Sequence, residues 1–159
     1  MNESELLKQI IAAFREVPKP TRFTLCTCDE CRNLHTALSA CTRETLTDLD
    51  LRHQSCLLSQ DAFHYFIPAL IRLALPSAER DSDLANEFIA DLCQPVSKGS
   101  PLCRHPRATA FTVQQTAAVL AFLVYIRDNI EWEFGQPSRE IIRGISNWQW
   151  YLNKHEEPN

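Results

Sequence analysis

The chain has 159 residues, of which 45% are hydrophobic and 23% charged, a composition typical of one globular domain large enough to bury a core. Its formal net charge of −4 disfavours a general nucleic-acid-binding protein, which normally carries a basic surface, and leaves room for a basic protein partner. With only three glycines, the sequence favours helices over a turn-rich β-sandwich.

The N-terminal segment predicts an amphipathic helix. Apolar residues recur at helical spacing over 3–17, Asn2 and Glu5 have the spacing of a capping box, and Pro18 ends the helix. The segment lacks the basic start and apolar stretch of a signal peptide. The longest uninterrupted apolar run, 117–126, is too short to span a bilayer. We therefore expect a cytoplasmic protein without a membrane segment.

Between residues 21 and 75 the sequence predicts an extended piece and several helices, the last of which is the most apolar. An extended piece over 21–25 leads into a cysteine-rich run, which is followed by a helix over 29–40 and a helical turn over 45–51. Residues 59–75 are apolar on nearly every face, so as a helix they have to be surrounded by protein. Ser59 is a good N-cap for this central helix.

The second half alternates helices with one long loop. Helices are predicted over 82–93, 112–134 and 138–155, whereas 94–110 contains three prolines and forms a loop. The tail 156–159 is expected to fray. The sequence thus predicts an all-α fold, in which residues 1–155 form a single compact domain of about six helices around the central helix.

One local motif contains residues that could bind a metal or react as thiols, namely Cys26-Thr27-Cys28-Asp29-Glu30-Cys31. Seven cysteines in a cytoplasmic protein are better explained as thiols or metal ligands than as disulfides. The two-residue gap between Cys28 and Cys31 lets two thiolates reach one zinc ion, and Cys26 offers a third ligand. His35 lies one helical turn beyond Cys31, and the long loop adds Cys103 and His105. These six residues are the candidate ligands of a structural zinc site.

Two other interpretations of the cluster remain open. A C-x-x-C pair at a helix start is also the spacing of disulfide oxidoreductases, although the acidic neighbours Asp29 and Glu30 disfavour a thiolate. Alternatively the cysteines pack as small hydrophobic residues. Packing is the preferred interpretation for the cysteines on apolar stripes, namely Cys41, Cys56 and Cys93.

Two motifs together resemble a bacterial family of uncharacterised small proteins. The first is the cysteine run itself, in which those relatives have histidine where this chain has Cys26. The second is the motif Leu58-Ser59-Gln60-Asp61-Ala62-Phe63-His64-Tyr65-Phe66-Ile67-Pro68-Ala69-Leu70. Since histidine and cysteine both serve as zinc ligands, the exchange at position 26 favours metal binding over packing. The resemblance implies the same fold and carries no assigned activity.

Partner-binding candidates lie outside the cluster. Trp150 points away from the apolar stripe of the last helix, and tryptophan is a frequent interface anchor. Arg104 and Arg107 form a small basic patch in the long loop, which is too small for nucleic-acid affinity.

The sequence contains no Gly-rich phosphate loop, nucleophile elbow or zinc-protease motif, which disfavours the common enzyme classes. Our first hypothesis is therefore a non-catalytic protein-binding module, most concretely a cytoplasmic immunity protein that neutralises a toxin or effector partner. The alternative is an enzyme that uses Cys26, Cys28 and Cys31 as an open zinc or thiol site, with His64 or His105 as the acid–base partner.

Overall fold

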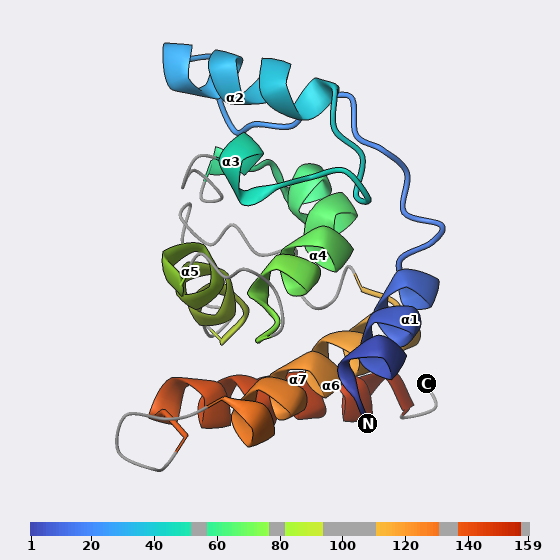
Figure 1. The fold of residues 1–159 in the computed structure, drawn as a ribbon. Helices are drawn as coiled ribbons and strands as arrows, with labels where there is room; N and C mark the ends of the chain where they lie inside the picture. Colours follow the sequence, from blue (N-terminus) through green and yellow to red (C-terminus); the bar gives the residue numbers. More distant parts are fainter. Residues whose placement is uncertain (52–56, 77–81, 94–110, 131–136, 157–159) are drawn as a thin grey trace.

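Seven helices build the described part of the protein (Figure 1). The computed structural model describes residues 1–51, 57–76, 82–93, 111–130 and 137–156. The helices are α1 (Glu3–Ala13), α2 (Asp29–Ser39), α3 (Asp48–Leu51), α4 (Gln60–Ala74), α5 (Ser82–Cys93), α6 (Val113–Asn129) and α7 (Arg139–Glu156). Within these ranges the only β-type pairing is an isolated antiparallel bridge between Thr24 and Leu58. The predicted all-α fold of a single domain is confirmed.

Helix α4 lies at the centre of the fold because nearly every face of it is apolar. Ten of its fifteen residues are buried. Its N-terminus is capped as predicted, since the Ser59 hydroxyl accepts a hydrogen bond of 3.2 Å from the Ala62 N–H. Pro68 lies within the helix and, having no N–H, leaves the carbonyl of His64 without its helical donor. The predicted central helix at 59–75 is confirmed, with Ser59 and Leu75 as its two caps.

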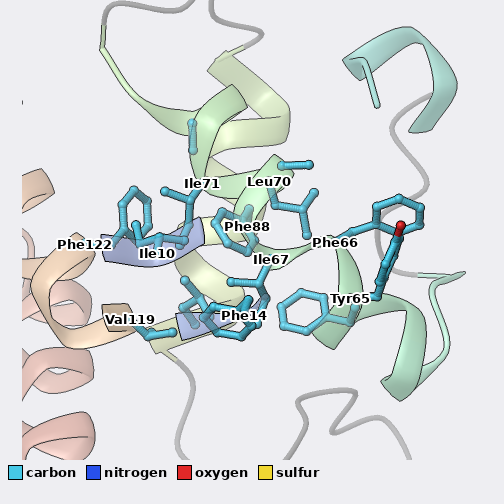
Figure 2. Packing of buried hydrophobic residues seen from close by; sticks show 14 of the residues in the cluster. Ile10, Phe14, Tyr65, Phe66, Ile67, Leu70, Ile71, Phe88, Val119 and Phe122 are labelled. Atoms are coloured by element: carbon cyan, nitrogen blue, oxygen red, sulfur yellow. The ribbon is translucent and has the colours of Figure 1, made fainter. Parts of the chain in front are cut away.

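The other helices surround α4 on several sides. Helices α6 and α7 pack along each other, α1 packs against α6 and α4, and α5 contacts both α7 and α4, whereas α3 packs on α2 (Figure 1). Figure 2 shows the core where four of these elements meet, with Ile10, Phe14, Phe66, Ile67, Phe88, Val119 and Phe122 among its buried side chains. Because each such side chain contributes about 1.5–3 kcal/mol on burial, this shared core holds α1, α4, α5 and α6 together.

Helices α5 and α7 approach each other closely at a glycine. Gly144 is buried, and a Cβ at this position would lie 2.5 Å from Cys93 Sγ and 2.9 Å from Cys93 Cα. One turn further along, the Trp148 indole Nε1–H donates to the carbonyl of Leu92 over 2.8 Å. The end of α5 is therefore fixed on α7 by steric fit and by one buried hydrogen bond.

Helix α1 ends at Ala13, before the predicted Val17, because a distant side chain satisfies the carbonyls that follow it. The Arg43 guanidinium donates to the carbonyls of Phe14 and Val17. Its Cζ also lies 4.4 Å from the centre of the Tyr65 ring. A positive charge at a helix C-terminus is favourable, so Arg43 both ends α1 and joins it to α4.

The short helix α3 begins at Asp48 and not at the predicted residue 45. Thr47 and Asp50 account for this start, since each side chain accepts a hydrogen bond from the other residue's backbone N–H. This reciprocal pattern is a capping box, which the sequence analysis did not recognise.

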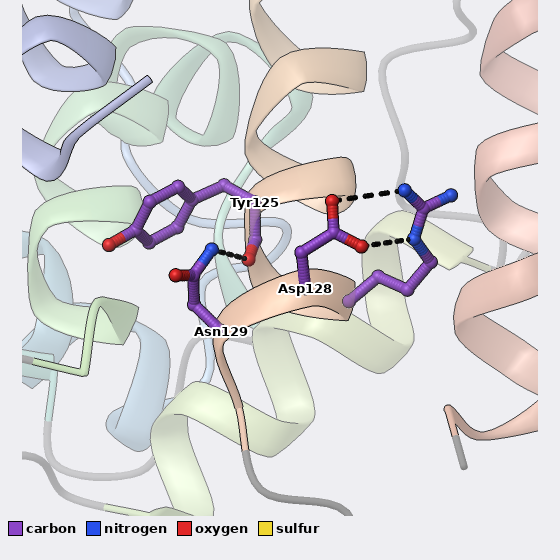
Figure 3. A network of polar contacts seen from close by, with 4 residues as sticks. Tyr125, Asp128 and Asn129 are labelled. Carbon is purple, nitrogen blue, oxygen red and sulfur yellow. Dashed lines mark hydrogen bonds and ion pairs between the residues drawn. The ribbon is translucent and has the colours of Figure 1, made fainter.

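Helix α6 ends at Asn129 and not at the predicted Phe134. Ile130 adopts an extended backbone with ψ of 136° and packs against the core, which diverts the chain from the helix. Figure 3 shows the polar end of α6, where the Asn129 amide donates to the Tyr125 carbonyl and Arg127 pairs with Asp128 through contacts of 2.7 and 3.0 Å. This exposed ion pair is an ordinary surface contact of small energy.

No helix within the described residues is both long enough and apolar enough to cross a membrane.

Candidate metal-binding cluster

The thiols of Cys26, Cys28 and Cys31 lie together at the start of α2. Cys26 Sγ is 3.1 Å from Cys28 Sγ and 3.1 Å from Cys31 Sγ, and all three sulfurs lie within 4.8 Å of one another. Among the described residues, no other group of three or more histidine, cysteine or carboxylate side chains brings its ligand atoms so close. The structure therefore brings together three of the six predicted ligands.

The local backbone explains how one sulfur is buried while two stay in water. Cys28 is the N-cap of α2 and has an extended backbone, with φ of −63° and ψ of 167°. Cys31 follows in the first turn of the helix and is completely buried, whereas Cys26 and Cys28 are exposed. The cluster thus lies at the boundary between core and solvent, at the N-terminus of α2.

The segment before the cluster is held on the start of α4. The Leu25 N–H donates to the carbonyl of Leu57 over 3.0 Å, and the Ser59 N–H donates to the carbonyl of Phe23 over 2.8 Å. The Ser59 hydroxyl also donates to the carbonyl of Arg22. Within the predicted extended piece at 21–25, these contacts pair Thr24 antiparallel to Leu58, and they place Cys26 directly after an anchored backbone.

His35 lies on α2 beyond Cys31 as predicted, but it is not a member of the close group of ligand atoms. The backbone N–H of Phe23 donates to His35 Nδ1 over 3.4 Å, and the two rings contact edge to face at 5.5 Å. With Nδ1 accepting, the neutral ring carries its proton on Nε2 and is therefore a hydrogen-bond donor on that side. The other two predicted ligands, Cys103 and His105, lie outside the described residues.

A cleft of about 550 Å³ adjoins the cluster. Cys26 is the one member of the cluster that lines it. The other residues that line it are Thr21, Arg22, Thr24, Thr27, Arg32, His35 and Thr36. The sequence analysis missed Arg22 and Arg32, because residues so far apart reach one cleft only where the chain doubles back at the cysteines.

The two arginines of the cleft differ in their partners. Arg22 donates to the carbonyls of Thr24 and Leu25, at 3.0 and 2.7 Å. Arg32 pairs with Asp29 on the same helix, and both side chains are largely exposed. Such a solvated pair is weak, so the Arg32 guanidinium is able to exchange Asp29 for another anion.

His64, the predicted acid–base partner, is held in a different environment. Its ring stacks on Phe111 at 4.8 Å and meets Phe14 edge to face. Gln115 Oε1 accepts from the Thr112 N–H, so at 3.1 Å it also accepts from His64 Nε2. Burial lowers the pKa of His64, opposed by the Gln115 hydrogen bond. None of these neighbours lines the cysteine cleft.

The cysteines predicted to pack as hydrophobic residues do so where they are described. Cys41 and Cys93 are both buried. Burial, followed by the nearby Asp50 carboxylate, raises the pKa of Cys41. Burial also raises the pKa of Cys93, to about 12. Cys56 lies outside the described residues.

Of the predicted partner-binding residues, Trp150 lies on α7 and is 51% exposed. The Lys154 ammonium lies 4.1 Å from the centre of its ring. Arg104 and Arg107 lie outside the described residues.

Fold and cluster together define an all-helical domain with three neighbouring thiols, of which two are exposed and one is buried. The model of a family of unknown function (DUF6714) matches residues 2–149, and the chain belongs to this family. The membership confirms the resemblance to an uncharacterised family. No curated protein matches the chain, and no solved structure matches it.

Proposed function

We propose that the chain is a non-catalytic protein-binding domain whose N-terminal part is fastened by a zinc ion on Cys26, Cys28 and Cys31. The observation that carries this proposal is the approach of the three Sγ atoms to within 4.8 Å. Zinc holds thiolates at about 2.3 Å in a tetrahedral arrangement, which separates two sulfurs by about 3.8 Å. The sulfurs here, with two separations of 3.1 Å and none above 4.8 Å, need only small shifts to reach that geometry.

A metal at this position would add a link between the segment before the cluster and α2, which already meet where Phe23 contacts His35. Cys26 follows the segment anchored on Leu57 and Ser59, and Cys31 belongs to α2. An ion that bridges them would fix the start of α2 relative to the start of α4. We therefore assign the zinc a structural role.

The fourth ligand of a closed structural site has three predicted sources. Ligation through His35 Nε2 would require its proton to move to Nδ1, where the Phe23 N–H now donates, and ligation through Nδ1 would displace that N–H, so His35 is the least favourable source. Cys103 and His105 remain predicted ligands. Single replacements of Cys103 and His105 would identify the fourth ligand by the loss in zinc affinity.

Competition with a chromogenic chelator tests the zinc site. We expect wild-type protein to bind one zinc ion tightly and Cys28→Ser to lose this binding. The matched control is Cys41→Ala, which removes a thiol from outside the cluster and should keep one tight site. Equal zinc affinity of wild type and Cys28→Ser would refute the site.

The protein-binding role draws its support from the outer face of α7. Trp150 and Ile142 are both about half exposed on this helix, at 51% and 50%. Tryptophan is enriched at the centres of protein interfaces. Arg143 and Lys154 lie on the exposed side of the same helix, so this face would favour an acidic patch of a partner.

We keep the immunity-type role as the most specific form of this proposal, with a toxin or effector as the partner. Co-purification with the products of neighbouring genes tests it, using Trp150→Ala as the interface variant and exposed Gln149→Ala as its control. Binding that is lost only in Trp150→Ala would support the role. Failure to bind any neighbouring product would refute it.

One observation favours an enzyme as the second candidate function. The cluster supplies three ligands, and a cleft of about 550 Å³ beside Cys26 could admit a substrate to an open fourth position. Replacement of Cys28 by serine separates the two roles. A folded Cys28→Ser protein that has lost a measurable activity would indicate chemistry, whereas loss of folding would indicate a structural metal.

A further inference from the structure

Cys26 is the point at which the cysteine cluster meets the cleft. We infer that Cys26 is a site of reversible thiol–disulfide exchange with a small anionic disulfide that binds in this cleft. The product is a disulfide between Cys26 and either Cys28 or Cys31, and its formation expels the metal. Expulsion rests on the proposed zinc site, whereas the exchange itself requires only the three thiols.

The sulfur geometry favours Cys26 as the shared partner. Its Sγ lies 3.1 Å from both other sulfurs. A disulfide bond is about 2.05 Å long, so either bond requires the atoms to approach by only about 1 Å. Formation of one bond consumes two of the three thiolate ligands, and a single remaining thiolate does not hold zinc tightly.

Accessibility sets the order of events. Cys31 is completely buried and cannot meet an external disulfide directly. Cys28 is exposed but does not line the cleft. Cys26 is both exposed and part of the cleft wall, so a disulfide bound there reaches Cys26 first. Cys28 and Cys31 are then placed to act as the resolving thiols.

The walls of the cleft indicate the charge of the disulfide. Arg22 and Arg32 are cationic, and His35 offers a donor at Nε2 because its Nδ1 accepts from Phe23. Carboxylate groups are the natural partners of guanidinium groups. The volume of about 550 Å³ falls within the range of about 300–1,000 Å³ that is usual for small-molecule sites. A small peptide disulfide with free carboxylates fits this description.

The chemistry balances as a two-electron exchange. The Cys26 thiolate attacks one sulfur of the disulfide RSSR, so that a mixed disulfide Cys26–SR forms and one RS⁻ leaves. The thiolate of Cys28 or Cys31 then attacks Cys26 Sγ, which breaks the bond to SR and releases the second RS⁻. The two RS⁻ groups take up the protons of the two cluster thiols, or solvent protons if metal was bound. RSSR is reduced to two RSH, and the cluster is oxidised.

The first experiment treats metal-free full-length protein with oxidised glutathione and maps the disulfides by mass spectrometry. We expect a loss of two hydrogens, with Cys26 in the new bond, while the buried Cys41 and Cys93 stay reduced and serve as internal controls. A bond between Cys28 and Cys31, a bond from Cys26 to any other cysteine, or persistence of three free thiols would overturn the inference.

The second experiment removes one positive charge from the cleft and measures the rate of reaction with an anionic and with a neutral disulfide. Arg32→Gln should slow the reaction with oxidised glutathione about threefold at low ionic strength, the effect of one charge a few ångströms away in water. It should leave the rate with neutral hydroxyethyl disulfide unchanged. The control Arg139→Gln, on α7, should change neither rate. Equal effects of Arg32→Gln on both disulfides, or none on either, would overturn the assignment of the cleft.

The third experiment uses zinc-loaded protein and follows zinc release with a chromogenic chelator as oxidised glutathione is added. Release in step with disulfide formation supports the coupling of exchange to metal loss, and retention of zinc by disulfide-bonded protein overturns it. Protein that never binds zinc would refute the proposed function, while the exchange on metal-free protein would still be decided by the disulfide map.

Discussion

Two of the described cysteine environments, the cluster at the start of α2 and the surroundings of Cys93, differ in what contacts the sulfur. At the start of α2, Cys26 and Cys28 are exposed and their sulfurs contact other sulfurs. At the contact of α5 with α7, Cys93 is buried and its sulfur faces the backbone of Gly144. The first environment offers metal ligands and a route for oxidants, whereas the second offers only packing. Burial and neighbours, more than residue type, decide what a cysteine does.

Removal of metal should produce the largest difference between the two environments. If zinc fastens the cluster, protein with free zinc at 100 times the dissociation constant should be about 2.7 kcal/mol more stable than protein in excess chelator. Urea denaturation followed by circular dichroism measures this difference. Cys28→Ser should unfold at the same urea concentration with and without the chelator. If the wild-type protein also unfolds at the same urea concentration with and without the chelator, the account is contradicted.

Gly144→Ala tests the packing at Cys93 and should have the next largest effect. The added Cβ would lie 2.5 Å from Cys93 Sγ and 2.9 Å from Cys93 Cα, and backbone cannot move aside cheaply. Overpacking of this kind costs about 1–3 kcal/mol, against which alanine regains up to about 1 kcal/mol of helix propensity. Thermal or urea denaturation should show a net loss of stability.

The exposed Ser146→Ala, two residues along α7, provides the control and should change the free energy of unfolding by less than about 0.5 kcal/mol. Cys93→Ala should relieve the cost of Gly144→Ala only in part, because the Cα and Cβ of residue 93 remain in place. A Gly144→Ala protein as stable as wild type would show that α5 and α7 are less tightly packed than described here.

The Cys93 thiol also predicts a dependence of stability on alkaline pH. Burial, and after it the nearby Glu140 carboxylate, raises the pKa of Cys93 from 9.0 to about 12. The unfolded chain loses this proton at lower pH than the folded protein does. The stabilising contribution is therefore complete below pH 9 and is lost as the pH rises towards about 12. Wild type should lose stability more steeply than Cys93→Ala over this range, and parallel curves would count against the buried thiol.

His64 should give the smallest effect, in the acidic range. Burial lowers its pKa from 6.5, so the unfolded state binds the proton more readily than the folded state. Its contribution to stability is complete above pH 6.5 and declines as the pH falls below that value. His64→Gln should flatten the pH dependence of the unfolding free energy below about pH 6.5. An unchanged slope would show that the ring is not desolvated.

Strong periodicity and caps made the fold predictable. The apolar run around Phe66 required a surrounded helix, and Ser59 and Thr112 marked the starts of α4 and α6 correctly. The predicted ends of α1 and α6 were wrong because tertiary contacts, and not the local sequence pattern, determine where these helices end. The guanidinium of Arg43, which is remote in sequence, binds carbonyls that follow Ala13, and the backbone at Ile130 becomes extended before the predicted helix end at residue 134.

The candidate site was predictable only in part. The short spacing of Cys26, Cys28 and Cys31 was sufficient to bring three ligands together, since one helix start contains them all. The position of His35 outside the cluster was not predictable, because it follows from the backbone N–H of Phe23 and the antiparallel pairing of Thr24 with Leu58. The cleft lies beside the same pairing, so the local sequence around Arg22 and Arg32 did not indicate that both residues line it.

The central claim is that the cluster of Cys26, Cys28 and Cys31 binds a metal while Cys41 and Cys93 do not. Elemental analysis of full-length protein, purified without a histidine tag or added metal, tests it most directly. The account predicts one zinc ion per chain in wild type and in Cys41→Ala, and none in Cys28→Ser. Wild-type protein that contains no metal and does not take up zinc on addition would contradict the account.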